Sequence, residues 1–97
     1  MSNEEIIKEL RSLYDTINKI RRISAYSQEE GGRVAARAMM YIYGWHSRDK
    51  NGKTARDEAM SMLRKAVLAN DPKDPWESLI ISQSAIESFL NDVDKGT

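Results

Sequence analysis

Residues 33–48 read RVAARAMMYIYGWHSR, the most apolar and aromatic run of the 97-residue chain. Winding this run at about 100° per residue gathers a broad apolar face, made of Val34, Ala35, Ala38, Met39, Ile42 and Trp45. A second sector, about 80° wide, holds Arg33, Arg37, Tyr41, Gly44 and Arg48. A helix with so little polar surface is typical of the middle of a bundle or of a contact with another molecule. We therefore place this helix, expected over 28–48, at the centre of the fold.

The chain before this run predicts a second amphipathic helix, over 3–24. Ser2 and Glu5 have the spacing of a capping box, in which each side chain accepts a hydrogen bond from the other residue's amide. Apolar residues then recur in steps of four and three, at Ile6, Leu10, Leu13, Ile17 and Ile20. This seam spans only about two heptads, which favours a bundle helix over a free-standing coiled coil.

Serine and glycine residues interrupt the apolar pattern between these two helices. Ser27 and Glu30 repeat the capping-box spacing, so the central helix is expected to begin near residue 28. Gly31 and Gly32 then lie in its first turns. The alternative is a helix that begins after them, because glycine costs up to about 1 kcal/mol in a helix interior.

The chain after the central helix predicts a turn and a third helix. Residues 49–52, Asp-Lys-Asn-Gly, have the composition of a tight turn. Thr54 is then placed to cap a helix over 54–70, with Asp57 and Glu58 in its first turn.

A fourth helix is expected over 75–94. Asp74, Pro75 and Glu77 have the residue types preferred at the N-cap, first and third helical positions. No stretch alternates with period two, and no repeat is visible at a longer period. The sequence thus predicts an all-α fold, a compact bundle of four helices joined by short loops in a single domain over 1–97.

The composition is that of an ordinary globular protein, with 40% hydrophobic and 31% charged residues. There is no cysteine, which excludes disulfides and thiolate metal sites and favours a reducing compartment. No apolar run approaches about 18 residues, and no basic-then-apolar leader is present. We therefore expect a cytoplasmic protein without a membrane partner.

The net charge of zero hides an uneven distribution along the chain. Residues 1–53 carry ten Lys and Arg against seven Asp and Glu, or +3, and residues 54–97 carry five against eight, or −3. Within 19–53, eight basic residues stand against three acidic ones, or +5. This excess can attract phosphate or an acidic protein surface. It is small beside that of domains that hold duplex DNA, so a duplex DNA partner is disfavoured.

Few residues of this chain suit catalysis. His46 is the single histidine, and in the absence of cysteine the usual nucleophiles and general bases are scarce. Ser47 and Asp49 follow His46 too closely on one helix end to converge with it as a triad, so we interpret His46 as a half-buried helix histidine. The acidic pairs of the chain lie at expected helix starts, where the helix macrodipole explains them. We expect no enzymatic activity, no cofactor and no metal site.

The arginine stripe of the central helix is the strongest candidate binding site. It comprises Arg33, Arg37, Tyr41 and Arg48, and it is joined by Arg21, Arg22 and Tyr26 near the first hairpin. Guanidinium groups bind phosphates and carboxylates bidentately, and tyrosine rings stack on bases, so the set suits a phosphate-bearing ligand or an acidic partner. The alternative is that the arginines cover apolar surface and form salt bridges with Glu29, Glu30 or acidic residues of the last helix.

At least one aromatic residue of the central helix is expected to face a loop, a partner chain or solvent. Tyr41, Tyr43 and Trp45 point in different directions on a helix, so they cannot all enter one core. We assign self-association, as a homodimer or larger oligomer, to Met40, Tyr43 and Trp45.

The sequence favours a small non-enzymatic binding or regulatory protein that acts through macromolecular interaction and self-association, for example a microbial or phage accessory inhibitor. The alternative hypothesis is an oligomeric helical module that binds or sequesters a nucleotide, a cyclic nucleotide or a short nucleic acid through its Arg and Tyr clusters.

Overall fold

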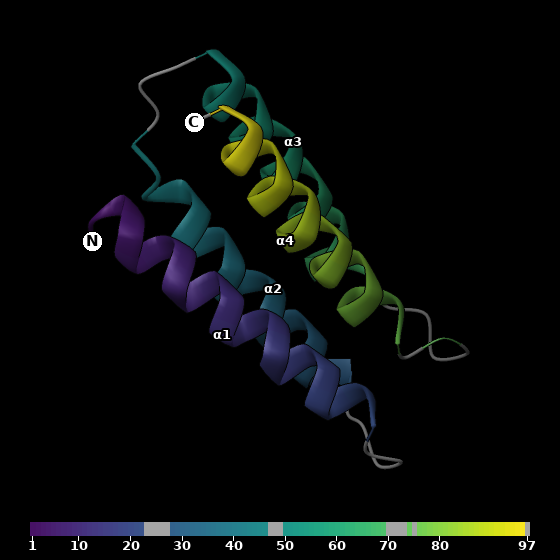
Figure 1. The fold of residues 1–97 in the computed structure, drawn as a ribbon. Helices are drawn as coiled ribbons and strands as arrows, with labels where there is room; N and C mark the ends of the chain where they lie inside the picture. The colour runs from purple at the N-terminus through teal and green to yellow at the C-terminus, as the bar shows by residue number, and fades with distance from the viewer. Residues whose placement is uncertain (23–27, 47–49, 70–73, 75, 97) are drawn as a thin grey trace.

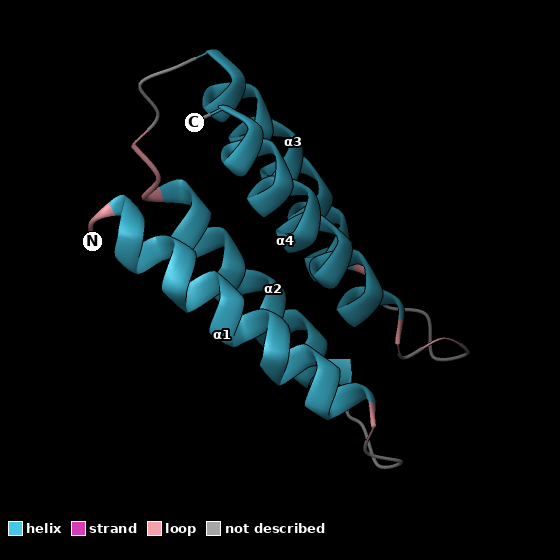
Figure 2. Cartoon of the chain, in the orientation of Figure 1, coloured by secondary structure: helices cyan, strands magenta, loops and turns pink. Residues whose placement is uncertain are grey.

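The chain forms an all-α bundle of four helices in the computed structural model, which describes residues 1–22, 28–46, 50–69, 74 and 76–96 (Figure 1). The helices are α1 (Asn3–Arg21), α2 (Gln28–Tyr43), α3 (Lys50–Leu68) and α4 (Glu77–Gly96). Consecutive helices run in opposite directions, and the described part of the chain contains no strand (Figures 1 and 2). The predicted fold class is confirmed.

The start of α1 has the local structure that its sequence predicts. The Ser2 hydroxyl accepts a hydrogen bond from the Glu5 amide at 3.2 Å, and the Glu5 carboxylate accepts one from the Ser2 amide at 3.4 Å. The helix ends at Arg21, three residues before the predicted end at 24. The amide of Arg22 closes it by donating to the carbonyl of Lys19 at 3.1 Å.

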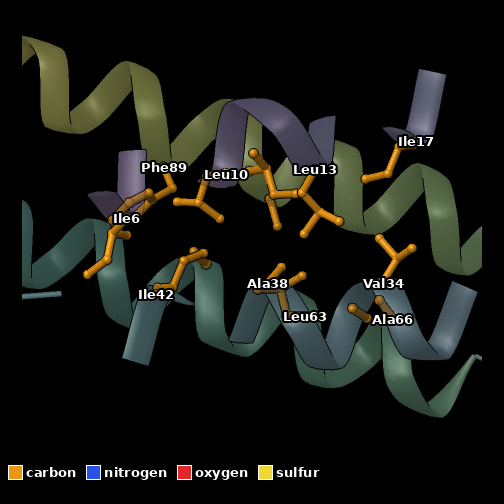
Figure 3. Close-up of a cluster of buried hydrophobic side chains, with 14 of the residues drawn as sticks. Ile6, Leu10, Leu13, Ile17, Val34, Ala38, Ile42, Leu63, Ala66 and Phe89 are labelled. Atoms are coloured by element: carbon orange, nitrogen blue, oxygen red, sulfur yellow. The ribbon is translucent and has the colours of Figure 1, made fainter. Parts of the chain in front are cut away.

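The core is built differently on its two sides. α1 presents large side chains, Ile6, Leu10, Leu13 and Ile17, which are all buried. Figure 3 shows them pointing toward α2, with Ile6 near Ile42 at one end and Ile17 near Val34 at the other. The buried faces of α3 and α4 are instead rich in small residues, Ala55, Ala59, Ala66, Ser78, Ser82 and Ala85.

These side-chain sizes explain which helices lie closest together. α3 and α4 make the most extensive helix pair, and α2 packs on both of them. The distance between two helix axes depends on the side chains at their contact, so alanine and serine allow α3 and α4 to approach closely. α1 packs against α2 and α4 through its larger residues, and within the described ranges it makes no close approach to α3.

The structure at the end of α2 differs from the prediction in the last residue of the helix and in the role of Trp45. The helix stops at Tyr43 rather than Arg48, and the amide of Trp45 donates to the carbonyl of Ile42 at 3.0 Å in a tighter turn. Trp45 ends this turn and is 7% exposed in the core, as its place on the predicted apolar face requires. Its ring meets that of Phe89 edge to face, with the centroids 5.4 Å apart. Trp45 is therefore a core residue and not a self-association contact.

α3 begins at Lys50, four residues before the predicted cap at Thr54. The turn predicted at 49–52 is therefore wrong for residues 50–52, which continue the helix. The preference of Asn and Gly for turns is a bias of about 1 kcal/mol or less per residue, and the surrounding structure readily overrides it. As a consequence, Asp57 and Glu58 lie in the third turn of α3 rather than in the first.

α4 begins within two residues of its prediction, at Glu77. The carbonyl of Asp74 accepts from the amide of Glu77 at 3.3 Å, and the carbonyl of Trp76 accepts from the amide of Ile80 at 3.0 Å. Pro75 lies outside the described residues. The helix continues to Gly96, two residues beyond the predicted end.

Candidate interaction surfaces on α2

The helix α2 exposes two different surfaces, one toward α1 and one toward α3. Arg33, Arg37 and Tyr41 lie on the α1 side, where the first two line a groove between the helices. Met40 and Tyr43 lie on the α3 side, where Tyr43 meets Arg56. The buried residues of α2 belong to the core and lie between these two surfaces.

The α1–α2 groove has a volume of about 360 Å³. Its lining combines apolar residues with hydroxyl, acidic and basic groups, namely Leu13, Thr16, Ile20, Glu30, Arg33, Val34 and Arg37. A smaller recess of about 50 Å³ extends it toward Glu9, Ser12 and Tyr41. Arg37 lines both spaces, together with Leu13 and Thr16.

The three described members of the stripe differ in their interactions. Tyr41 donates its phenolic hydrogen to a Glu9 carboxylate oxygen at 3.5 Å. Arg33 is also engaged with a neighbouring group. Arg37 is exposed and has no hydrogen bond or ion pair among the residues that the structure describes. The salt bridge expected for Arg37 as an alternative is therefore not formed within that part of the chain.

Of the remaining candidate residues, the structure describes Arg21 and Arg22, and neither lines this groove. Arg21 points to α4, where its guanidinium donates to Oε1 of Gln83 at 2.6 Å. Arg22 is exposed at the end of α1, and its described contact is the backbone cap of that helix. Arg48 and Tyr26 lie outside the described residues. Among the described residues of the predicted set, Arg33, Arg37 and Tyr41 therefore lie together on the α1 side of α2.

Gln83 is a residue whose role the sequence analysis missed. It is buried in α4, where its amide nitrogen donates to Oδ1 of Asn18 at 2.6 Å while its carbonyl oxygen accepts from Arg21. Both polar ends are satisfied, so the residue holds the end of α1 against α4 at little desolvation cost. In the sequence, Gln83 is a polar residue that helical spacing places in line with the apolar Leu79, Ile86 and Val93 of the last helix.

The other end of α1 is held by a pair of hydrogen bonds to the backbone of His46. Asn3 donates to the His46 carbonyl at 2.7 Å and accepts from the His46 amide at 3.0 Å. His46 itself is exposed and lies beyond α2, so its interpretation as a half-buried helix histidine is wrong. These two hydrogen bonds hold the turn that contains Trp45 against the start of α1.

The α3 side of α2 carries the most exposed apolar residues of that helix. Met40 is 70% exposed and Tyr43 is 69% exposed. The guanidinium of Arg56 lies 5.1 Å from the centroid of the Tyr43 ring and donates to the carbonyl of Trp45 at 3.4 Å. Arg56 therefore holds Tyr43 in place by a cation–π contact. The sequence did not reveal this pair, because it forms between two helices.

The described ranges hold neither a metal-ligand cluster nor a membrane-spanning helix. No three histidine or acidic side chains gather there as potential metal ligands. None of the described helices combines the length and apolar character needed to cross a membrane.

Comparison with protein-family models, with curated proteins and with solved structures finds no match for this chain.

Proposed function

We propose that this chain is a small non-enzymatic binding protein that self-associates through α2 and acts by binding another macromolecule. The observation that carries the proposal is the exposure of Met40 and Tyr43 side by side on one helix surface. Fully burying a side chain of this size contributes about 1.5–3 kcal/mol. Methionine and tyrosine are also enriched at protein interfaces, and the flexible methionine side chain adapts to a partner's surface.

Sedimentation of the wild-type chain over a range of micromolar concentrations tests this function. We expect species heavier than the 11.1 kDa chain, and Met40→Asp should weaken their association at least about tenfold, because it places a charge in the contact. Ile80→Asp is the matched control, since Ile80 is an exposed apolar residue of α4. A wild-type chain that stays monomeric would remove self-association from the proposal.

A second candidate function is capture of a phosphate-bearing ligand, such as a nucleotide, a cyclic nucleotide or a short nucleic acid, in the α1–α2 groove. The supporting observation is Arg37, which has no ionic partner in the described structure and lines a groove of about 360 Å³. A guanidinium group binds phosphate bidentately, and the neighbouring hydroxyl of Ser12 offers a further donor.

Thermal unfolding at low salt with a panel of such ligands tests this candidate. A ligand at about 100 times its dissociation constant adds about 2.7 kcal/mol, which raises the midpoint of a domain of this size by roughly 10–20 °C. We expect Arg37→Ala to abolish the shift. Arg11→Ala is the control, because Arg11 lines a separate groove between α1 and α4. A flat panel with the wild-type chain would contradict ligand capture.

A further inference from the structure

Asp57 and Arg64 are two of the charged residues on the exposed side of α3. Asp57 and Arg64 are both exposed, and neither has a hydrogen bond or ion pair among the described residues. They are seven residues apart, which is about 10 Å along a helix and too far for a pair within it. Because α3 begins at Lys50, Asp57 also lies beyond the first turn, where the macrodipole acts.

The adjacent side of α2 carries a row of residues that increase in size. Ala36, Met40 and Tyr43 follow one another in steps of four and three, so they line one edge of the helix. All three are exposed. A small residue therefore lies at one end of the row, a large ring lies at the other, and a flexible methionine lies between them.

The contact between Tyr43 and Arg56 sets the register of the two helices. α2 and α3 pack side by side and run in opposite directions (Figure 1). One turn away from the Tyr43–Arg56 contact, Met40 is level with Met60, which is half-buried against the core. Met60 also lies midway between Asp57 and Arg64. The midpoints of the apolar row and of the charge pair thus coincide.

We infer that this surface, the α2–α3 face, docks against a second copy of itself across a two-fold axis at the level of Met40 and Met60. The α2–α3 face comprises Ala36, Met40 and Tyr43 of α2 with Asp57, Met60 and Arg64 of α3. The inference rests on the self-association proposed above and specifies its geometry. Each helix then runs antiparallel to its own copy.

This two-fold axis brings opposite charges together on α3 and places a large side chain against a small one on α2. Asp57 faces the partner's Arg64, and the reciprocal pair forms at the other side of the axis, because a two-fold interface repeats every contact. Tyr43 covers the partner's Ala36, and Met40 meets the partner's Met40. A parallel arrangement would place Asp57 against Asp57 and Arg64 against Arg64, so like-charge repulsion opposes it.

Charge reversal tests this geometry. Asp57→Arg and Arg64→Asp each place like charges opposite one another twice in the dimer, so we expect each variant alone to associate at least about tenfold more weakly than the wild type. Mixing the two variants in equal amounts should restore a dimer, because one chain is then basic and the other acidic at both positions. The double variant Asp57→Arg/Arg64→Asp should associate with itself like the wild type.

Native mass spectrometry and sedimentation can separate these species, with one variant carrying a tag that marks the heterodimer by mass. Glu87→Arg, an exposed charge reversal on α4, is the control and should leave association unchanged. Circular dichroism should show the same helix content in every variant.

The outcomes separate this geometry from self-association itself. Single variants that dimerise like the wild type, or that dissociate without rescue on mixing, would overturn the α2–α3 face while the Met40→Asp result still stands. A wild-type chain that is monomeric throughout would overturn the self-association on which this inference rests.

Discussion

Replacing Phe89 with alanine should lower the free energy of unfolding by about 3–5 kcal/mol. Phe89 is 1% exposed and is among the largest fully buried side chains of the protein. Its truncation leaves a cavity next to Trp45 and removes their edge-to-face contact, which by itself is worth about 0.5–1.5 kcal/mol. Because small domains are stable by only about 5–15 kcal/mol, this change should remove a large part of the total.

Urea unfolding followed by far-ultraviolet circular dichroism measures this loss. All variants are compared at one protein concentration, because self-association would add to the apparent stability. Phe89→Leu is the matched variant: it keeps most of the buried volume and should cost clearly less than Phe89→Ala. An equal loss in both variants would show that the aromatic contact, and not the filled volume, dominates at this position.

The second large effect is expected for Leu10→Ala, at about 2–5 kcal/mol. Leu10 is fully buried, and it belongs to the row of large residues by which α1 packs on α2 and α4. Since α1 lies farthest from the closely packed pair of α3 and α4, loss of this side chain should also loosen α1 locally. Hydrogen exchange should therefore show the amides of α1 losing protection before those of α3 and α4.

Leu68→Ala is the control for this substitution. Leu68 ends α3 and is 79% exposed, so its truncation should change stability by no more than about 0.5 kcal/mol. Equal losses of protection in α1 and α3 in the Leu10→Ala variant would contradict local loosening of α1. That result would indicate that the four helices open as one unit.

Short-range patterns predicted the helices and most of the core. Ile6, Leu10, Leu13 and Ile17 repeat at helical spacing, and all four are buried as the repeat requires. The capping box of Ser2 and Glu5 needs only residues three apart, so it formed as predicted. The central apolar run likewise provides the buried face of α2.

The candidate site was predictable only in part. The row of Arg33, Arg37 and Tyr41 follows from helical spacing, but whether it faces α1, α4 or solvent depends on how the helices pack. Arg21 has the same chemistry as Arg37, yet its position brings it to the buried amide of Gln83. The partners of a charged side chain lie on other helices, so its own sequence neighbourhood does not specify them.

The helix boundaries show the same division. Trp45 is buried against Phe89 as its helical spacing predicts, but it lies beyond the end of α2, next to the hydrogen bonds between Asn3 and His46. α3 begins at Lys50, before the predicted start at 54, although Asn51 and Gly52 favour a turn. Local preferences of about 1 kcal/mol decide where a helix ends only when tertiary packing favours neither boundary.

The sequence by itself determined that this chain is a four-helix bundle, because hydrophobic periodicity and caps act over distances of one or two helical turns. Only the tertiary structure decided which surface each residue occupies. Helix pairing is set by contacts between side chains far apart in the chain, where the small residues of α3 and α4 allow close approach and the large residues of α1 do not. That pairing leaves Arg37 on one side of α2 and Met40 and Tyr43 on the other.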